Sequence, residues 1–476
     1  MRVLEGLRPE APLYFFEELC AIPHGSHNTK QISDYCVAFA RERGLRYVQD
    51  ASNNVVIYKP ASPGYEGHPT VILQGHLDMV CEKDPGCDID FLHDGLRLKH
   101  DGTSIYAEGT TLGGDDGIAV AYGLALLDSK EMKHPPLEVV FTIDEEVGML
   151  GADALDCALL SGRTLINCDS EDEGVLTVSC AGGARVTLRL PLTRETKTRE
   201  EDCLRVSVCG LTGGHSGVEI NKGRANANKL LAKWLEKLPV NLIGIGGGSQ
   251  DNAIPREACA VLRTPAAAKI AAELFERLPE LRKILPPQER EVRFVVEAFS
   301  CDTPALTAEA SAAMLTLLNA LPNGIQSMSR AIEGLVQTSL NLGIVAVEGD
   351  MLRATFSVRS SVNSEKEALL GELRAIADRF GAAYKQSGEY PAWEYRENSR
   401  LRDVMVETYR ELYGSTPIVE AIHAGLECGI FSDRLPGLDA VSFGPKMRDI
   451  HTSREKLDIA SAGRTWDYLC KILEAL

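Results

Sequence analysis

Helical and strand-like patterns of apolar positions alternate along the first 185 residues of the chain. Apolar residues at helical spacing predict amphipathic helices, and short runs rich in Val and Ile predict buried strands. The segment 115–128 is apolar nearly all round, which predicts a fully buried helix. In chain order, these elements are expected at 11–20, 29–43, 53–59, 70–75, 115–128, 136–143 and 163–169. Such alternation is typical of a mostly parallel sheet with helices on both faces.

Near residue 185 the pattern changes to strict alternation of apolar and polar positions. In the segment 351–360, Leu352, Ala354, Phe356 and Val358 fall on one face, as expected of an antiparallel strand with one face in water. Helices are predicted at about 224–237, 266–278, 306–320 and 364–380. Ser364 and Glu367 have the spacing of a capping box for the last of these helices. The glycine-rich stretch 244–249 is expected to be a loop.

From about residue 393 the first pattern returns, with a helix at 398–413, two strands and a terminal helix from about 455. The fold class predicted is therefore α/β, with a mostly parallel sheet formed by residues 1–185 and 393–476. A separate α+β domain, residues 186–392, is inserted between those two segments. A chain of 476 residues is long enough for two or three domains.

The charge balance excludes several classes of partner. The chain has 50 Lys and Arg against 68 Asp and Glu, a net charge of −18. A general nucleic-acid binder needs a basic face to neutralise phosphates, and an anionic membrane surface also selects positive charge. We therefore expect no nucleic-acid partner and no membrane partner, and the acidic charge is most simply explained by solubility.

The lack of a recognisable signal peptide, together with the cysteine usage, predicts a cytoplasmic protein. The first 20 residues contain Glu5, Glu10, Glu17 and Glu18 and no uninterrupted apolar run, so they do not resemble a signal peptide. No stretch reaches the ~18 apolar residues that a membrane helix requires. The 13 Cys are scattered without a CxxC pair, which favours reduced thiols in a cytosol.

Polar side chains stand at the ends of several apolar segments, where ligands of α/β sheets collect. They are His76, Asp78, Asp115, Asp116, Glu145, Glu146, Asp169 and His451. Taken singly, each has an ordinary explanation. A histidine at a strand end is commonly a surface residue, an Asp before a helix is usually an N-cap, and a glutamate pair after a strand is usually solvated.

Taken together, these residues form a nitrogen and oxygen ligand set for two divalent cations. Zinc accepts imidazole and carboxylate, and cobalt or manganese can occupy the same kind of site. Asp78 can accept the second imidazole N–H of His76 and so fix its tautomer. The adjacent glutamates then have separate roles, with Glu146 as a metal ligand and Glu145 as a general base for a water molecule.

The motifs that carry these residues resemble a known family. They are "GHLDMV", "TLGGDDGIAV", "DEEVGMLGA", "NCDSE" and "GGHSG". The chain is similar over essentially its whole length to the co-catalytic zinc peptidases that include aminoacylase, carboxypeptidase G and carnosinase. The segments "IPHGSHN", "NAIPRE" and "AIHAGLECG" are similar to a bacterial branch of dipeptidases that prefer Xaa-His substrates, such as carnosine.

The resemblance implies a role for each candidate residue. Asp115 would bridge two metal ions, most simply zinc, with His76 and Asp169 completing one shell and Glu146 and His451 the other. Asp78 and Glu145 would be the catalytic pair, and the peptide bond between Asp115 and Asp116 would be cis. Many relatives carry a Lys after the Asp pair, where this chain has Gly117, but this branch also lacks that Lys. This branch often has Asn at position 116. Asp116 is therefore the position where altered local charge is expected.

The resemblance also implies residues that contact the dipeptide substrate. His215 would donate to the developing oxyanion, and Asn252, Arg359, His423 and Glu427 would hold the two ends of the substrate. From the residues alone, His215 can equally be a turn histidine, Arg359 a surface guanidinium and Glu427 a salt-bridge partner. The inserted domain is expected to be a lid that also contributes to a homodimer.

Two other functions stay open at this point. A metal-dependent aminoacylase or deacylase would share the metal centre but act on N-acyl amino acids, and its pocket would be apolar where a dipeptidase needs an acidic group for the free amine. A binding protein that has lost catalysis would be indicated by a missing ligand. Every ligand that the family requires has a matching residue here.

Overall fold

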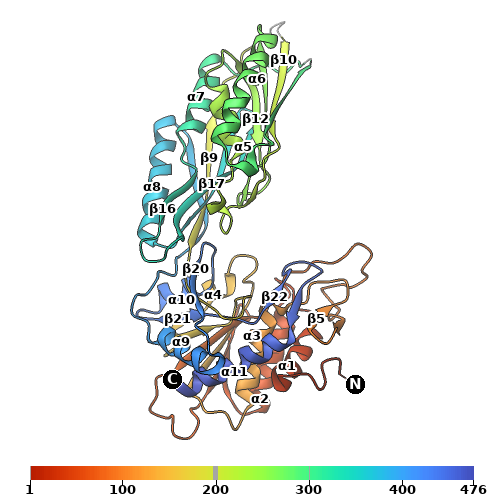
Figure 1. The fold of residues 1–476 in the computed structure, drawn as a ribbon, viewed down its shortest axis with the longest axis vertical. Helices are drawn as coiled ribbons and strands as arrows, with labels where there is room; N and C mark the ends of the chain where they lie inside the picture. Colours follow the sequence, from red (N-terminus) through yellow and green to blue (C-terminus); the bar gives the residue numbers. More distant parts are fainter. Residues whose placement is uncertain (1, 197–201, 300) are drawn as a thin grey trace. The chain divides into compact units, whose positions relative to one another are not determined.

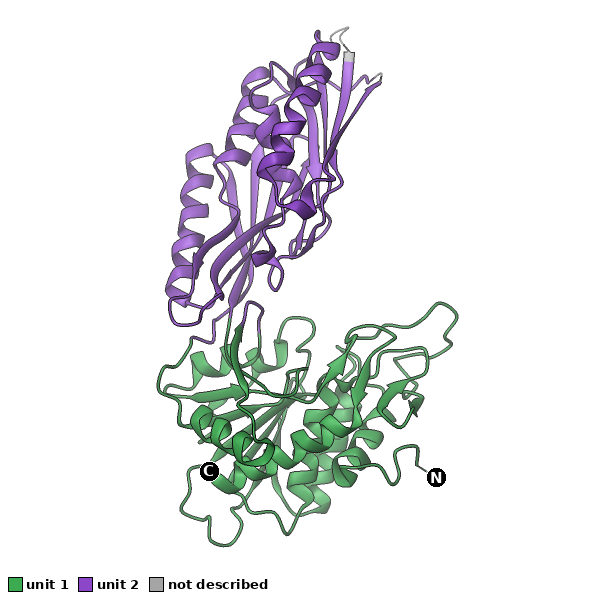
Figure 2. Cartoon of the chain, viewed as in Figure 1, with its two compact units in different colours: residues 1–180, 395–421, 426–476 green, residues 181–394, 422–425 purple. Residues whose placement is uncertain are grey.

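The computed structural model describes residues 2–196, 202–299 and 301–476, and it separates into two compact units (Figures 1 and 2). Unit 1 comprises Met1–Cys180, Tyr395–Ala421 and Leu426–Leu476, and unit 2 comprises Ala181–Glu394 and Ile422–Gly425. The boundaries predicted after residues 185 and 392 lie close to these divisions. The assignment of residues 422–425 to unit 2 was not predicted.

Unit 1 is built on an eight-stranded mixed sheet. Its strand order is β1 (Arg46–Gln49), β2 (Val55–Lys59), β6 (Leu137–Thr142), β3 (Val71–His76), β7 (Thr164–Asn167), β21 (Asp439–Ser442), β8 (Val175–Cys180) and β20 (Ile418–Ile422). The central strands β6, β3, β7 and β21 are parallel, whereas β1 pairs antiparallel with β2, β2 with β6, and β8 with β21. The sheet is therefore parallel at its centre, which is the part that carries the site residues.

Helices on the sheet of unit 1 complete its core. They are α1 (Glu10–Cys20), α2 (Lys30–Glu42), α3 (Gly114–Asp128), α4 (Leu150–Ala154), α9 (Arg400–Tyr413), α10 (Cys428–Arg434) and α11 (Ile459–Ala475). The α3 helix lies against β3 and α1. Its Tyr122, Leu124 and Leu126 are fully buried, as the sequence predicts for this segment. Apolar residues of α1, α2, α3, α9 and α11 share one core cluster with Leu73 and Val139 of the sheet.

A small four-stranded sheet in unit 1 has the order β22 (Met447–Arg448), β23 (Lys456–Asp458), β5 (Ser104–Ala107) and β4 (Leu98–His100). The β22 and β23 strands pair antiparallel, so residues 449–455 form the loop of a hairpin. This loop carries His451, whose backbone has a positive φ of 59°.

Unit 2 contains a nine-stranded sheet whose recorded pairings are all antiparallel. Its strands are β15 (Arg293–Phe299), β10 (Asp202–Cys209), β14 (Ala258–Thr264), β12 (Asn241–Gly247), β17 (Val336–Glu348), β18 (Met351–Ser360), β9 (Gly182–Pro191) and β19 (Ala383–Tyr390), with β16 (Gly324–Met328) beside β17. The core face of the sheet presents Val186, Val206 and Phe356. It is covered by α5 (Ala227–Leu235), α6 (Ala267–Ile284), α7 (Ala308–Ala320) and α8 (Asn363–Phe380).

Two local expectations in unit 2 are wrong. The stretch 244–249 is not simply a loop, because β12 continues to Gly247. A Cβ at Gly247 would lie 2.2 Å from Asn228 Oδ1, so glycine is needed there for close packing. The α8 helix begins at Asn363 after Val362 and has no side-chain cap, so Ser364 and Glu367 do not form a capping box.

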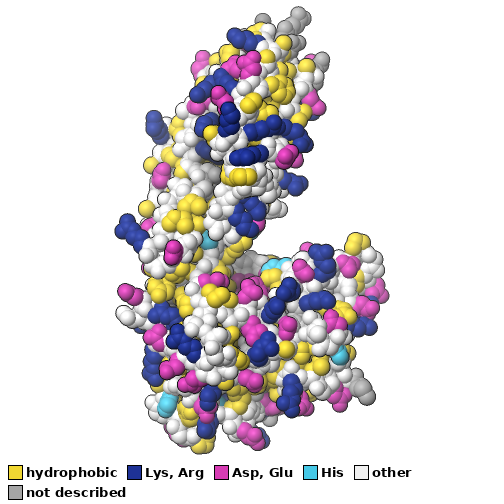
Figure 3. All heavy atoms as spheres, in the orientation of Figure 1, with side chains coloured by type: hydrophobic (Ala, Val, Ile, Leu, Met, Phe, Trp, Pro, Cys, Tyr) yellow, Lys and Arg dark blue, Asp and Glu magenta, His cyan; other side chains and the backbone are white. Residues whose placement is uncertain are grey.

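Charged side chains of both signs are interspersed on the face of the molecule seen in Figure 3. The net charge of −18 therefore does not form a single-sign surface on that face. Among the described residues, no helix combines the length and the apolar composition needed to cross a bilayer.

Candidate metal centre

The ends of three neighbouring parallel strands bring the candidate ligands together in unit 1. His76 is the last residue of β3, Glu145 and Glu146 follow β6, and Asp169 follows β7. Because β6, β3 and β7 are adjacent and parallel, their carboxyl ends meet at one edge of the sheet. The buried, β-branched strand sequences fix this arrangement, and the polar residues begin where each strand stops.

His76 is anchored through Nδ1 and presents Nε2 to the cluster. It is buried, and Nδ1 donates to the main-chain oxygen of Asp78 at 2.9 Å. The Asp78 carboxylate is farther away, with Oδ1 at 3.4 Å from Nδ1, so the carbonyl is the closer partner rather than the carboxylate that the sequence predicts. Nε2 donates to Asp115 Oδ1 at 3.1 Å. Burial opposes protonation, but Asp115 and Asp78 raise the pKa of His76 well above its usual value.

Asp115 lies between two imidazole rings. It sits in a kink at the start of α3, and its peptide bond to Asp116 is cis, as the resemblance implies. His451 Nε2 donates to Asp115 Oδ2 at 3.0 Å and to Glu146 Oε1 at 2.9 Å. Burial opposes ionisation, yet the hydrogen bonds from His451 and His76 hold the pKa of Asp115 below its usual range. One carboxylate that faces two imidazole nitrogens through its two oxygens has the geometry of a bridging ligand.

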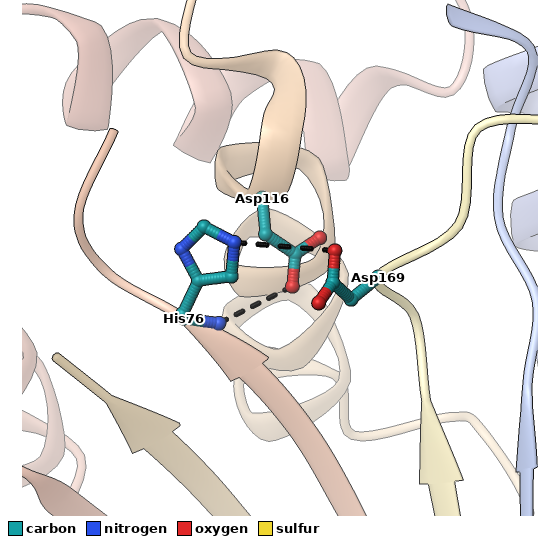
Figure 4. Close-up of side chains that lie close together, drawn as sticks. All are labelled: His76, Asp116 and Asp169. Atoms are coloured by element: carbon teal, nitrogen blue, oxygen red, sulfur yellow. Dashed lines mark hydrogen bonds and ion pairs between the residues drawn. The ribbon is translucent and has the colours of Figure 1, made fainter. Parts of the chain in front are cut away.

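Asp116 and Asp169 approach the other side of His76, and the three side chains converge in Figure 4. The Asp116 Oδ2 atom accepts the main-chain N–H of His76 at 3.2 Å, and Asp169 Oδ1 lies 3.9 Å from His76 Nε2. Asp116 Oδ1 is buried and has no hydrogen-bond partner among the described residues. Burial, with Asp115 and Asp116 nearby, raises the pKa of Asp169 well above its usual value.

The two adjacent glutamates diverge because the strand ends before them. β6 stops at Thr142, and Asp144 has a positive φ of 53°. The main-chain N–H groups of Glu145 and Glu146 donate to the Asp78 carboxylate at 3.0 and 3.4 Å. The Glu146 carboxylate accepts from His451, whereas Glu145 makes no recorded side-chain hydrogen bond. Burial, with neighbouring Glu427, Glu146 and Asp115, raises the pKa of Glu145 to about 8.

The donor set fits divalent cations. Imidazole nitrogen and carboxylate oxygen are the ligands that zinc, cobalt and manganese use in proteins. Two overlapping groups, His76 with Asp116 and Asp169 and His76 with Asp115 and Glu146, have donor atoms within 4.8 Å of one another. Burial, and after it the neighbouring carboxylates, raises the pKa values of Asp169 and Glu145, and a bound cation would favour their ionised forms.

Glu455 is a part of this site that the sequence analysis missed. It is 3% exposed, and its carboxylate accepts the main-chain N–H groups of Leu112, Gly113, Gly114 and Asp115 at 2.8–3.4 Å. These are donors that the start of a helix leaves without intrahelical partners. Glu455 belongs to the same hairpin as His451, so it joins that loop to the turn that carries Asp115. A lone glutamate in a loop gives no sequence signal for this role.

Glu427 lies in unit 1 and is fully buried. One carboxylate oxygen accepts from Thr142 Oγ1 at 2.7 Å and from Gln74 Nε2, while Oε1 has no partner among the described residues. Burial raises the pKa of Glu427 to about 7. No salt bridge of Glu427 is found among the described residues, so the structure does not show the salt-bridge partner that the sequence left open for this residue.

Unit 2 contains the remaining candidates. Nδ1 of His215 accepts the main-chain N–H groups of Gly217 and Val218, both at 3.2 Å, which leaves the proton of the neutral ring on Nε2. Arg359 Nη1 donates to the Tyr390 hydroxyl at 3.1 Å, and its buried Nε has no hydrogen-bond partner among the described residues.

His423 joins this group through residues 422–425. The Ser339 hydroxyl and His423 Nε2 are 2.7 Å apart. Burial, with Arg359 and His215 nearby, lowers the pKa of His423 to about 4, and burial with Arg359 also lowers the pKa of His215. Asn252 is exposed, and its main-chain oxygen accepts from the Ser216 N–H at 2.8 Å. Three of the four predicted substrate residues therefore belong to unit 2, and Glu427 belongs to unit 1.

The chain matches the sequence profile of a known peptidase family. The sequence profile described as peptidase family M20/M25/M40 matches residues 72–475. The chain belongs to this family. The M20 assignment accounts for the motifs around His76, Asp115, Glu145 and Asp169, all of which fall inside the matched range.

Individual members of the M20 family are similar over the full length. The cytosol non-specific dipeptidase of Escherichia coli is 38% identical, over 100% of this chain and 99% of its own length. The crystal structure of an aminoacylhistidine dipeptidase from Vibrio alginolyticus matches with a TM-score of 0.94 and 38% identity, covering 99% of this chain and 98% of that one. Human carnosine dipeptidase 1, at 12% identity and a TM-score of 0.51 over 97% of this chain and 95% of its own, shares the fold.

Proposed function

We propose that the chain is a metal-dependent dipeptidase that hydrolyses unblocked dipeptides, with a preference for Xaa-His substrates such as carnosine. Full-length similarity at 38% identity to a non-specific dipeptidase and to an aminoacylhistidine dipeptidase supports this substrate class. The observation that carries the proposal is the Asp115 carboxylate, which faces His76 Nε2 and His451 Nε2 at 3.1 and 3.0 Å.

The ligand assignment follows the contacts around Asp115. We propose that these residues would hold two divalent ions: Asp115 would be shared between them, His76 and Asp169 would complete one shell, and Glu146 and His451 would complete the other. Zinc is the proposed metal, and cobalt or manganese would fit the same donors. When bound, such ions activate a water molecule and polarise the scissile carbonyl. The bond from His76 Nδ1 to the Asp78 carbonyl supports Nε2 as the ligating atom.

Glu145 is the proposed general base. Among the described residues its carboxylate makes no recorded hydrogen bond, and it follows β6 beside the proposed ligand Glu146, so it is free to accept a proton from a nearby water. In the proposed reaction, Glu145 takes a proton from the attacking water and returns it to the leaving amine. Asp78 holds His76 and the main-chain N–H groups of Glu145 and Glu146 in place.

The residues of unit 2 have proposed roles in substrate recognition. The Nε2–H of His215 is available as a donor for the oxyanion, because Nδ1 already accepts two main-chain N–H groups. Arg359 would bind the substrate carboxylate, since its buried Nε lacks a partner and a guanidinium binds carboxylates through paired donors. Asn252 and His423 would help to hold this end, and Glu427 would face the free amine.

We further propose a cytoplasmic location, because the E. coli relative is described as a cytosol enzyme. A homodimer, with unit 2 acting as lid and dimerisation domain, stays a prediction from the family resemblance. Light scattering coupled to gel filtration would give the mass of the assembly, to be compared with the 51.7 kDa of one chain.

A substrate panel tests the proposed function. Free product would be measured from β-Ala-His, Gly-His, Leu-Leu and N-acetyl-His, with chelator-treated protein and with added Zn²⁺, Mn²⁺ or Co²⁺. The proposal predicts metal-dependent cleavage of the three unblocked dipeptides, fastest for those with histidine, and no cleavage of N-acetyl-His. Cleavage of N-acetyl-His alone would instead establish an aminoacylase. Full-length similarity to two dipeptidases does not favour that alternative.

A further inference from the structure

The segment between α1 and α2 has no role in the function described so far. It contains "IPHGSHN", and its residues 24–26 run beside residue 79, immediately after Asp78. Gly25 and Met79 form a parallel β-bridge. The Met79 N–H donates to the His24 oxygen at 3.2 Å, and the Ser26 N–H donates to the Met79 oxygen at 3.3 Å. The main chain therefore fixes residues 24–26 against the Asp78 segment.

Gly25 allows this close approach. A Cβ at position 25 would lie 2.4 Å from Cys81 Sγ, inside van der Waals contact. A larger residue there would require the Cys81 side chain to move. The glycine thus places the next residue, Ser26, within hydrogen-bond distance of the Asp78 side chain.

Ser26 completes the hydrogen bonding of the Asp78 carboxylate. The Ser26 hydroxyl donates to Oδ2 at 2.8 Å, and the only other recorded donor to this oxygen among the described residues is the Glu146 N–H at 3.4 Å. The other oxygen, Oδ1, accepts the Glu145 N–H at 3.0 Å and faces His76 Nδ1 at 3.4 Å. Ser26 therefore makes the shortest bond to this carboxylate and helps to set its rotation.

The neighbouring residue contacts the second catalytic strand. The His27 N–H donates to Asp144 Oδ1 at 2.6 Å, and His27 Nδ1 lies 3.4 Å from Asp144 Oδ2. Asp144 directly precedes Glu145. Residues 24–27 are therefore bonded both to the segment after β3, which carries Asp78, and to the segment after β6, which carries Glu145 and Glu146.

We propose that Ser26 is a positioning residue for the metal centre: its hydroxyl orients the Asp78 carboxylate, which in turn holds the backbone of Glu145 and Glu146 and faces His76 Nδ1. This inference rests on the proposed function for its catalytic consequence. Groups that hold metal ligands in place typically change metal affinity or activity by about 10- to 100-fold when removed. Ser26 contacts Asp78, which is not itself a proposed metal ligand, so we expect an effect at the lower end of that range.

The first test is a set of single variants of the full chain. Ser26→Ala should lower kcat for Gly-His about tenfold, with KM changed less than twofold and with an unchanged midpoint of thermal unfolding. Ser26→Thr keeps a hydroxyl and should recover most of the lost kcat. Full kcat in Ser26→Ala, or a loss that Ser26→Thr does not recover, would overturn the proposal.

Ser33→Ala is the matched control. Ser33 is fully buried in α2, and its hydroxyl donates to the Asn53 oxygen at 2.7 Å, away from Asp78. Its removal should lower the unfolding midpoint and leave kcat unchanged. If Ser33→Ala lowered kcat as much as Ser26→Ala, the effect would reflect general destabilisation, and the positioning role of Ser26 would be rejected.

A double-mutant cycle separates this inference from the proposed function. Calorimetric titration of metal-free protein with Co²⁺ should show about tenfold weaker binding for Ser26→Ala and no further weakening when Ser26→Ala is added to Asp78→Ala. Equal weakening in both backgrounds would contradict an action through Asp78. This readout needs no turnover. A wild-type protein that binds Co²⁺ but cleaves no dipeptide would reject the proposed function, while the cycle would still decide the role of Ser26.

Discussion

The candidate residues of the two units carry opposite electrostatic imbalances. In unit 1, burial and neighbouring carboxylates raise the pKa values of Asp169, Glu145 and Glu427. In unit 2, burial and the nearby Arg359 guanidinium lower the pKa values of His423 and His215. Burial is the largest cause in both groups, and neighbouring carboxylates add to it in the first group whereas the Arg359 guanidinium adds to it in the second.

Each imbalance indicates the ligand that would relieve it. The carboxylates and imidazoles of unit 1 fit divalent cations, and the guanidinium and imidazoles of unit 2 fit an anion such as a peptide carboxylate. A dipeptidase needs both, since metal ions activate water and a cationic group recognises the free carboxylate. Replacing one residue in each unit tests whether unit 1 binds the metal ions and unit 2 binds the substrate carboxylate.

The largest effects are expected in unit 1. Glu145→Ala should lower kcat by roughly 10³- to 10⁴-fold, near the upper limit for general base catalysis, and should retain bound metal. His76→Ala should lose metal as well as turnover. Metal content by mass spectrometry, measured beside activity, distinguishes the two variants. Normal turnover in Glu145→Ala would refute its assignment as the base.

Removing the guanidinium of unit 2 should weaken substrate binding without affecting metal. Arg359→Met should raise KM for Gly-His by about 10- to 100-fold, since a charge-assisted pair with the substrate carboxylate is lost. Metal content should be unchanged, and the amide of the same dipeptide should be cleaved equally well by variant and wild type.

Arg353→Met provides the control for this prediction. Arg353 lies on the same strand, β18, and pairs with Glu348 at 2.8 Å. Its replacement should leave KM unchanged. Equal KM values for Arg353→Met and Arg359→Met would show that Arg359 does not bind the substrate carboxylate.

Replacing Glu455 tests how the turn that carries Asp115 is anchored. Glu455→Gln should weaken metal binding about tenfold, because the turn that carries Asp115 loses part of its anchor. It should also lower the free energy of unfolding by roughly 2 kcal/mol, since buried main-chain N–H groups lose a charged acceptor. Metal titration and urea unfolding measure the two effects. A variant with wild-type metal affinity would show that the turn keeps its shape without Glu455.

The last prediction is a pH dependence of stability in unit 2, which leaves catalysis unchanged. The pKa of His423 is lowered from 6.5 to about 4. Between these pH values, His423 is protonated in the unfolded chain but neutral in the folded protein. Its contribution to stability is fully present above pH 6.5 and is lost as pH falls from 6.5 toward 4, by on the order of 3 kcal/mol.

Urea unfolding at several pH values would measure this dependence in wild type and in His423→Gln. The variant should lose less stability than wild type across this window. Identical pH dependences would show that His423 does not titrate abnormally. The prediction concerns stability alone and does not depend on bound metal.

The sequence allowed the candidate ligands to be placed together because strand ends carry a strong signal. His76, Glu145 and Asp169 each follow an apolar run, and adjacent parallel strands necessarily bring their ends together. The inserted unit was visible as a change from buried to alternating strands near residue 185. These features depend on local pattern, which a single sequence contains.

Features that depend on long-range contacts were not predicted. Glu455 binds main-chain N–H groups more than 340 residues away in sequence, so no spacing rule identifies it. Residues 422–425 belong to unit 2 although they lie within a segment whose pattern matches unit 1. Gly247 looks like a loop residue but belongs to β12. Glycine is needed there because Asn228 leaves no room for a side chain.

The most direct test of the account is the number of metal ions that restore activity. Chelator-treated protein would be titrated with Zn²⁺ while Gly-His cleavage is followed, and bound metal would be measured at each point. The account predicts activity that rises to saturation at two ions per chain, with Glu146→Ala binding fewer ions and remaining inactive. Full activity in metal-free protein, or saturation without any bound ion near His76 and Asp115, would contradict it.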